Sequence, residues 1–254
     1  MILVNNGMAK SGSTLLLHYC LELLDHAYPV NGEDAFRRAV ATGQLAGFHE
    51  YMDAPTEQSL PILEGIAKTN GPIVVKTHTD TNDFLPAAIR QGRIVMVTTF
   101  RDPRDMLLSA IDHSRRVRND PDPVFQEFTN IEQSIPHARW WAKMAIHWIK
   151  SGLTLAVRYE DLLRSPESVL SRVATHWGIQ SNTHSVNEIV ARETQIREYG
   201  KNQFNRGKVS RWNEELRDDE ISMLNEGLKE EILALGYPLT RDEMARHGPD
   251  WSSQ

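Results

Sequence analysis

The chain has 254 residues, of which 40% are hydrophobic and 24% are charged, proportions typical of a globular protein with a buried core. Its formal net charge is −6, which excludes a general positive field for holding nucleic acid. Any anionic ligand must therefore be bound by a local cluster of cations and backbone amides.

Short, branched, apolar segments alternate along the chain with segments of helical periodicity. The expected buried strands are residues 2–4, 72–76, 94–99 and 153–157. The expected helices are residues 14–24, 56–69, 103–117, 135–150, 166–177, 185–198 and 218–235. Strands separated by helix-length segments indicate βαβ units. We therefore predict an α/β fold in which helices cover both faces of a parallel sheet, a three-layer αβα architecture.

The first expected strand leads into a loop, residues 7–14, and a helix follows. That order aims backbone N–H groups and the positive end of the helix dipole at one spot. Gly12 permits a close backbone approach, Lys10 adds a charge, and Ser13 and Thr14 add hydroxyl donors. The pattern predicts an anion-binding loop; the alternative is a helix start whose hydroxyls only cap orphan amides.

The position of the lysine distinguishes two kinds of phosphate loop. In a Walker A loop the lysine follows the second glycine, whereas here Lys10 precedes Gly12. The order Lys10-Ser11-Gly12-Ser13-Thr14 instead resembles the 5′-phosphosulfate loop of the sulfotransferase family. Two residues beside it depart from the family pattern, since Ala9 replaces a common Pro and Leu15 replaces the Trp that in many cytosolic members contributes to the adenine pocket. We therefore expect adenine to be contacted differently here.

A second candidate phosphate site follows the third expected strand. Arg101 at a strand end and Ser109 in the next helix can converge on one phosphate, with the arginine acting as a fork. The segment resembles the family's 3′-phosphate motif, in which a serine lies eight residues after the arginine. The side chains of Asp102 and Arg104 are expected to be exposed charges at a helix start that has Pro103 near its first position.

Two further segments resemble the family in the expected order. Tyr159 lies in a Tyr-Glu-Asp-Leu segment which in the family is close to the nucleotide. Residues 204–212 resemble a late loop of the family, although Asn205 and Ser210 replace a basic residue and a glycine. The resemblance implies that Asn205, Arg206, Gly207 and Lys208 help to bind the 3′-phosphate.

The resemblance covers about residues 1–215 and implies a P-loop α/β domain. It implies 3′-phosphoadenosine 5′-phosphosulfate (PAPS) as the sulfuryl donor, adenosine 3′,5′-bisphosphate (PAP) as the product, and no metal. We expect one domain over residues 1–254, in which residues 216–254 form a C-terminal helix and a polar tail. The tail after Gly236 is expected to pack loosely or to fray.

The expected catalytic residues are Lys10, Lys76, His78 and Ser109. Residues 72–78 end a predicted strand, where the active sites of α/β proteins gather. They resemble a family segment in which the histidine is the base and the lysine assists the transferring group. Lys10 is the candidate that neutralises the leaving phosphate. Alternative bases are His49, Glu50 and His113.

The acceptor is expected to be a small molecule with a hydroxyl or an amine. Its pocket should come from residues 45–60, 79–90 and 112–145. Aromatic side chains of one expected helix could line it, although core packing is the preferred interpretation for the last two: Trp140, Trp141 and Trp148. The basic run 115–118 could contact an anionic acceptor, but a solvated helix end is the preferred interpretation.

Two other functions remain open on the sequence. One is a P-loop nucleotide or small-molecule kinase, which would need the lysine after the glycine and a carboxylate for Mg²⁺. The other is a non-catalytic nucleotide-binding protein. The single cysteine, Cys20, and the absence of a visible signal peptide favour a cytoplasmic protein, or a domain separated from its anchor. No membrane contact is expected, and the sequence does not decide the oligomeric state.

Overall fold

Four parallel strands form one sheet in the part of the chain that the structure describes. The computed structural model describes residues 1–28, 30, 32–45, 54–117, 125–180, 183–192 and 207–247. The strands are β1 (Ile2–Gly7), β2 (Ile73–Thr77), β3 (Val95–Phe100) and β4 (Leu155–Arg158), in the order β2-β1-β3-β4. In register, Val4 of β1 lies between Val75 of β2 and Met96 of β3. Their apolar residues are buried on both faces, as predicted for parallel strands.

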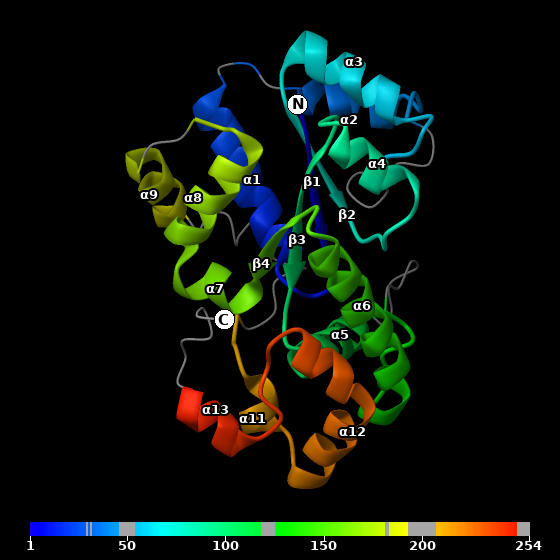
Figure 1. Cartoon of the computed structure of the whole chain (residues 1–254), viewed down its shortest axis with the longest axis vertical. Coiled ribbons are helices and arrows are strands. Elements are labelled where there is room, and N and C mark those ends of the chain that lie inside the picture. The colour runs from blue at the N-terminus through cyan, green and yellow to red at the C-terminus, as the bar shows by residue number, and fades with distance from the viewer. Residues whose placement is uncertain are drawn as a thin grey trace.

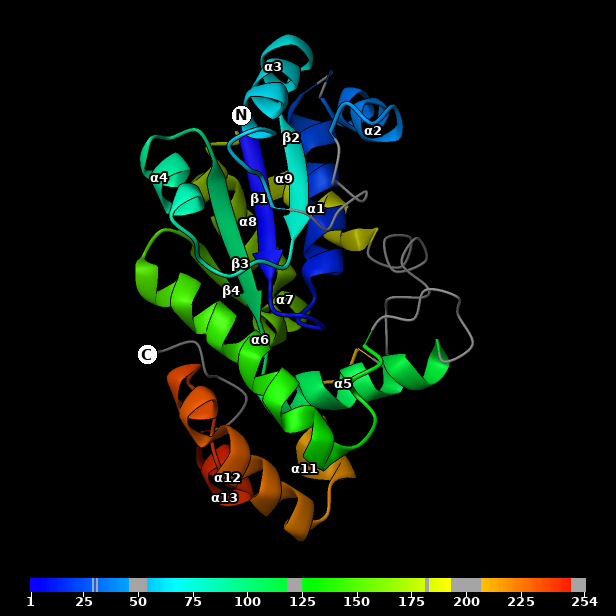
Figure 2. The same cartoon turned by 90° about the vertical axis from the view of Figure 1, so that its right-hand side faces the viewer.

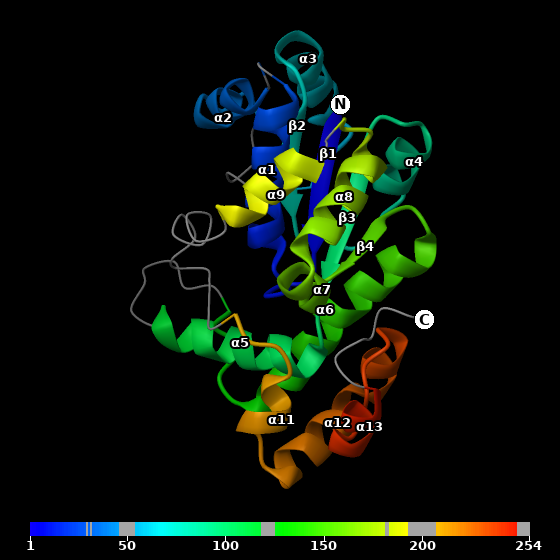
Figure 3. The ribbon, with the colours of Figure 1, turned by 90° about the vertical axis from the view of Figure 1, so that its left-hand side faces the viewer.

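Alternate residues of the strands point to two separate hydrophobic cores. Leu3 belongs to the core under α1 (Ser13–Ala27), α8 (Pro166–Trp177) and α9 (Thr183–Ala191). These three helices cover one face of the sheet, which is turned toward the viewer in Figure 3. Cys20 of α1 is buried in this core, as expected. The period of two in the strands therefore assigns each side chain to one helical layer.

Ile2 and Val4 point into the second core, on the opposite face. This core is shared with α2 (Glu33–Ala41), α3 (Leu60–Asn70), α4 (Phe84–Arg90) and α6 (Ile131–Ser151). Figure 2 shows α3, α4 and α6 on that face. The predicted three-layer arrangement, with helices on both faces of a parallel sheet, is confirmed.

Further helices lie beyond the carboxyl ends of the strands. These are α5 (Pro103–Arg116), α11 (Arg211–Glu215), α12 (Asp218–Ala234) and α13 (Arg241–His247), which form the lower part of Figure 1. Helix α7 (Tyr159–Arg164) begins directly after β4. Parallel strands place their carboxyl ends at one edge of the sheet, and this edge faces α5. Residues that follow β1, β2, β3 and β4 are therefore brought to one region.

The predicted strands and longer helices agree with the structure to within a few residues, and two expectations need correction. Helix α3 begins at Leu60 and not at residue 56, because Thr56 and Ser59 cap each other's backbone N–H groups with their hydroxyls at 2.8 and 3.1 Å. The tail after Gly236 does not pack loosely over its described part. Tyr237 is buried and its hydroxyl donates to Glu160 at 2.8 Å, and α13 follows. The predicted helix 185–198 is confirmed as far as residue 191, and residues 193–198 lie outside the described residues.

Candidate active site

The loop between β1 and α1 is fixed by hydrogen bonds to the sheet. Lys10 and Gly12 have φ angles of 58° and 85°, and these left-handed residues turn the chain so that α1 begins at Ser13. The hydroxyl of Ser11 lies 2.5 Å from the carbonyl of Met8 and 2.7 Å from the hydroxyl of Thr99 on β3. The Ser11 side chain therefore holds the shape of the loop from within. Residues 7–14 form a preorganised helix start of the kind that binds anions.

Several cations gather at this loop. The pKa of Lys10 is lowered to about 8 by burial and, to a smaller degree, by Arg116, Lys76 and Arg101. Burial also lowers the pKa of Lys76 to about 8, and its Nζ donates to the hydroxyl of Thr14 at 2.9 Å. Each of these lysines is therefore held where its charged form is disfavoured, and an anion bound among the cations would relieve that cost.

His78 follows β2 and is held by the backbone of the loop. Its Nδ1 lies 2.6 Å from the carbonyl oxygen of Gly7. A carbonyl can only accept, so Nδ1 carries the hydrogen in the neutral ring and Nε2 carries the lone pair. The next residue, Thr79, is fixed on both sides, since its N–H donates to Asn6 at 3.0 Å and its carbonyl accepts from the indole of Trp148 at 2.8 Å. The imidazole is thus oriented by its neighbours in the chain.

The environment of His78 keeps it neutral. Its pKa falls to about 3 because burial and the charges of Lys76 and Lys10 oppose protonation, against a smaller opposite effect of the bond to Gly7. The ring of Trp141 meets the imidazole edge to face, with 5.7 Å between the ring centres. The neutral imidazole therefore offers an unprotonated Nε2 beside the cations of the loop.

Arg101 follows β3 directly and is buried, with its guanidinium 4.3 Å from the centre of the Tyr159 ring. Its Nη2 donates to the carbonyl of Lys208 at 2.6 Å and to the carboxylate of Asp105 at 3.2 Å. Its Nε is buried without a hydrogen-bond partner among the described residues. Ser109 of α5 is also buried. Arg101 therefore retains a donor for a ligand.

Tyr159 joins the two candidate anion sites. A Cβ added to Gly12 would lie 2.6 Å from Cδ2 of Tyr159, so the loop packs directly on this ring. The guanidinium of Arg101 also lies over this ring. The phosphate loop and Arg101 are therefore both in contact with one aromatic side chain.

Comparison with known proteins identifies the family. A family model described as the sulfotransferase domain matches residues 3–236. The chain belongs to the sulfotransferase family. The predicted identity as a sulfotransferase is thereby confirmed. No curated protein matches the chain.

Three solved structures share the fold of this sulfotransferase. A mouse sulfotransferase complexed with PAP has a TM-score of 0.61 and 16% identity, over 91% of this chain and 84% of its own. A retinol dehydratase in complex with androsterone and the inactive cofactor PAP has a TM-score of 0.60 and 15% identity, over 96% and 83%. A retinol dehydratase with retinol and PAP has a TM-score of 0.60 and 15% identity, over 91% and 80%.

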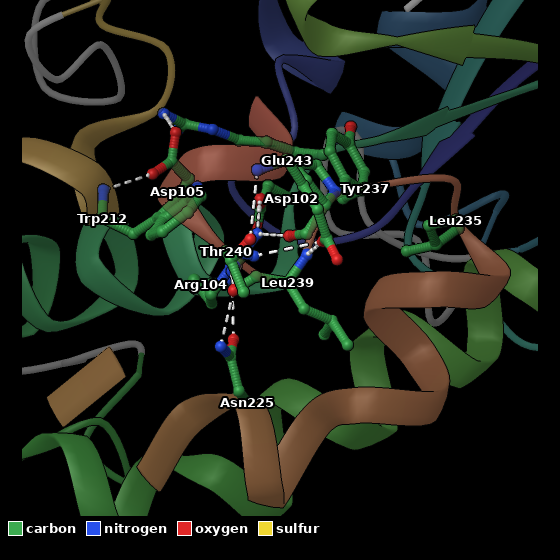
Figure 4. Close-up of polar contacts among 12 residues, drawn as sticks. Asp102, Arg104, Asp105, Trp212, Asn225, Leu235, Tyr237, Leu239, Thr240 and Glu243 are labelled. Atoms are coloured by element: carbon green, nitrogen blue, oxygen red, sulfur yellow. Dashed lines mark hydrogen bonds and ion pairs between the residues drawn. The ribbon is translucent and has the colours of Figure 1, made fainter. Parts of the chain in front are cut away.

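The prediction that Asp102 and Arg104 are exposed is wrong. Both residues are buried, and the guanidinium of Arg104 is held by the carboxylate of Asp102 at 2.7 and 3.0 Å. The same guanidinium donates to the carbonyl of Pro238 at 2.6 Å and to the side chain of Asn225 at 3.0 Å, and it stacks 3.6 Å from the Trp212 ring (Figure 4). The C-terminal part of the chain supplies further partners to Arg104, while Arg104 is itself the partner of Asp102.

Other predicted residues of the sulfotransferase have different outcomes. Asn205, Arg206, His49 and Glu50 lie outside the described residues. Gly207 and Lys208 precede α11, and the Lys208 ammonium lies 3.6 Å from Glu214 while its carbonyl holds Arg101. In the same segment Ser210 has a φ of 58°, the left-handed conformation that explains why the family pattern has glycine at this position. The reserve base His113 is buried, and its pKa falls to about 4 through burial, Lys10 and Arg116.

The aromatic residues of α6 divide between core and site. Trp148 is fully buried in the core, as preferred on the sequence. Trp141 is partly buried and packs against the same core, and it also meets His78, while the exposed Trp140 packs edge to face on Trp141. The sequence did not predict a role for Phe125, whose ring centre lies 5.9 Å from the Lys10 ammonium, or for Asp105. The spacing of four residues from Arg101, across the start of α5, was the signal available for Asp105.

The described residues contain neither a membrane-spanning helix nor a cluster of metal ligands. None of the helices in the described ranges is both long and apolar enough to cross a bilayer. No three His, Cys, Asp or Glu side chains of the described residues lie together as a metal site would require. That the reaction needs no metal remains a prediction.

Proposed function

We propose that the protein transfers a sulfuryl group from PAPS to a hydroxyl or an amine of a small molecule. The observation that carries this proposal is the shared contact of Gly12 and Arg101 with the ring of Tyr159. Two cationic sites joined in this way fit a nucleotide that bears groups at its 5′ and 3′ positions. The PAP in the three related structures supports the same nucleotide.

The 5′ group lies in the loop between β1 and α1. Backbone amides from Lys10 to Thr14 and the positive end of α1 face it, and the Lys10 ammonium adds a charge. Ser11 contributes through the shape of the loop, because its hydroxyl bonds to Met8 and Thr99. Burial and the neighbouring cations lower the pKa of Lys10, and the negative charge of the bound nucleotide would oppose that effect.

The 3′-phosphate lies against Arg101 and Ser109, with Gly207 and Lys208 on its other side. Arg101 has a buried Nε that can donate, and its Nη2 is bound to the backbone of Lys208. The resemblance assigns Asn205 and Arg206, which lie outside the described residues, to the same phosphate. Tyr159 separates the two groups of the nucleotide, and its position supports a contact with the nucleotide itself.

PAPS, when bound, supplies the sulfuryl group and a phosphate as the leaving group. The acceptor oxygen or nitrogen forms a bond to sulfur, the bond from sulfur to the 5′-phosphate oxygen breaks, and the acceptor proton passes to Nε2 of His78. The negative charge that grows on the leaving oxygen is stabilised by Lys10. Lys76, held on Thr14 at the end of the loop, steadies the transferring group. Ser109 acts through the 3′-phosphate by fixing the nucleotide in line.

His78 fits the role of base by geometry as well as by charge. The bond from Nδ1 to the Gly7 carbonyl fixes the tautomer that a base at Nε2 requires. Its lowered pKa keeps the ring unprotonated in the free enzyme, and the negative charge of the bound nucleotide offsets the nearby lysines. A base whose pKa rises on substrate binding can take a proton during transfer and release it afterwards.

Replacement of His78 tests this mechanism. His78→Ala is expected to reduce transfer of labelled sulfate from PAPS by at least about 100-fold, the lower range for a general base, while PAP affinity stays within about threefold. Acceptors are screened among alcohols, phenols, amines and sugars. The matched control is His26→Ala in the last turn of α1, an exposed position at the end of the helix away from the loop. Full activity of His78→Ala would refute the assignment.

A further inference from the structure

Two hydrogen bonds and a stacking contact join the segment that follows β3 to the segment that leads into α11. Arg101 donates to the carbonyl of Lys208 at 2.6 Å. Four residues later in each segment, the carboxylate of Asp105 accepts from the backbone N–H of Trp212 at 3.0 Å. In addition, the guanidinium of Arg104 stacks on the Trp212 ring. Figure 4 shows Asp105, Trp212 and Arg104 together.

Asp105 connects the two sides with one carboxylate. Its Oδ2 accepts from Nη2 of Arg101 at 3.2 Å, and its Oδ1 accepts from the backbone of Trp212. The side chain is fully buried, and burial raises the pKa of Asp105 against the opposing effect of Arg101. Removing one partner of a buried ion pair is strongly destabilising, because it leaves an uncompensated buried charge. Asp105 therefore sets the position of Arg101 relative to the segment before α11.

That relative position matters for a phosphate. A guanidinium binds phosphate as a planar fork, so its orientation decides how many oxygens it reaches. The two sides of the proposed 3′ site, Arg101 on one and Gly207 with Lys208 on the other, belong to segments that are about 100 residues apart in sequence. Without a tie between them, the fork and the backbone amides would have to be ordered each time the nucleotide binds.

We propose that Asp105 is a positioning residue that couples Arg101 to the segment before α11 and so sets the affinity for the 3′-phosphate. This inference rests on the proposed function. Two residues of one sequence motif then have different roles: Arg101 contacts the phosphate, whereas Asp105 acts through Arg101. The hydrogen bonds of the 5′ loop run to β1, β3 and β2 and do not include Asp105, and the contact between the loop and Arg101 is indirect, through the ring of Tyr159.

The test is Asp105→Asn, with PAP and 5′-AMP as probes for calorimetric titration. Asparagine keeps an oxygen for the N–H of Trp212 but loses the negative charge that holds Arg101. We expect the Kd for PAP to rise about 10- to 100-fold, as for loss of a hydrogen bond to a charged group. We expect the Kd for AMP, which lacks the 3′-phosphate, to change by less than about twofold.

Asp112→Asn is the matched control. Asp112 also lies on α5 and also ties it to α11, since its carboxylate accepts from Arg211 at 2.8 Å. This ion pair does not include Arg101. The control variant should therefore keep the wild-type ratio of PAP to AMP affinity.

The outcomes separate the inference from the proposed function. If the wild-type protein binds AMP as tightly as PAP, the proposed nucleotide is wrong and the inference falls with it. If the wild-type protein prefers PAP and Asp105→Asn keeps that preference, only the inference is overturned. If Asp105→Asn also loses AMP binding, the affinities of Asp105→Glu for PAP and AMP are measured as well. This variant keeps the charge and displaces the carboxylate. A selective loss of PAP affinity supports the positioning role, and equal losses of both nucleotides in both variants overturn it.

Discussion

Replacing Gly12 by alanine tests the contact on which the account of the site depends. Gly12 has a φ of 85°, and its α-carbon faces the ring of Tyr159. An added Cβ would lie 2.6 Å from Cδ2 of that ring, closer than side-chain carbons approach in proteins. The Tyr159 ring cannot retreat freely, because Arg101 lies against it. The substitution therefore acts on both candidate anion sites at once.

The magnitude follows from two separate costs. A side chain in the left-handed conformation costs about 1–2 kcal/mol, and overpacking by one methyl group in a close-packed region costs about 1–3 kcal/mol. The reduced entropy of the unfolded chain returns about 0.4–1 kcal/mol. We expect Gly12→Ala to lower the free energy of unfolding by roughly 2–4 kcal/mol. Displacement of Tyr159 should also weaken PAP binding by about 10-fold or more, which corresponds to about 1.4 kcal/mol.

Equilibrium urea unfolding and calorimetric titration with PAP measure the two effects. Gly65→Ala is the control, since Gly65 lies in α3, has an ordinary φ and has no atom within 4 Å of an added Cβ. Alanine there should stabilise the protein by about 0.5–1 kcal/mol through its helix propensity. The reasoning about Tyr159 would be refuted by a Gly12→Ala protein that is as stable as the wild type and binds PAP equally well.

Further predictions concern charge and backbone strain. Affinity for PAP should fall as the pH rises above about 8. The pKa values of Lys10 and Lys76 are near 8 in the free protein, so both lysines must then take up protons to bind the anion. Titrations from pH 7 to 10 that show constant affinity would exclude this. Ser210→Gly should raise the free energy of unfolding by about 0.5–1 kcal/mol through relief of a left-handed φ, and a lower urea midpoint would contradict it. Arg104→Met should lower the free energy of unfolding by about 3–5 kcal/mol, since it leaves a buried carboxylate without its partner. Arg217→Met, at an exposed ion pair, should lower it by less than about 1 kcal/mol. Equal free energies of unfolding for the two variants would disprove the difference.

The layers of the fold could be predicted from local patterns. Buried parallel strands are apolar at successive positions, and this signal placed all four strands within a few residues of their observed bounds. Helix α2 was not predicted, because it buries few apolar residues. Its place depends instead on Glu33, whose carboxylate accepts from the N–H of Val74 on the edge strand β2. A tertiary contact of this kind leaves no local periodicity.

The site could be predicted where its residues follow strand ends. Lys10, His78, Arg101 and Tyr159 come after four different strands, and parallel strands bring such positions together. The errors concern burial. Arg104 resembles a solvated charge at a helix start, and only residues more than 100 positions later in the chain reveal that it is covered. The position of Tyr159 between the two anion sites likewise depends on the packing of α7 against the loop.

The protein's use of a nucleotide with both 5′ and 3′ groups is tested most directly by calorimetric titration with PAP in the absence of metal, compared with ATP and Mg²⁺. We predict micromolar binding of PAP without metal and much weaker binding of ATP, because the phosphate loop and Arg101 both contact the ring of Tyr159. Tighter binding of ATP that depends on Mg²⁺ would contradict it and would favour a kinase.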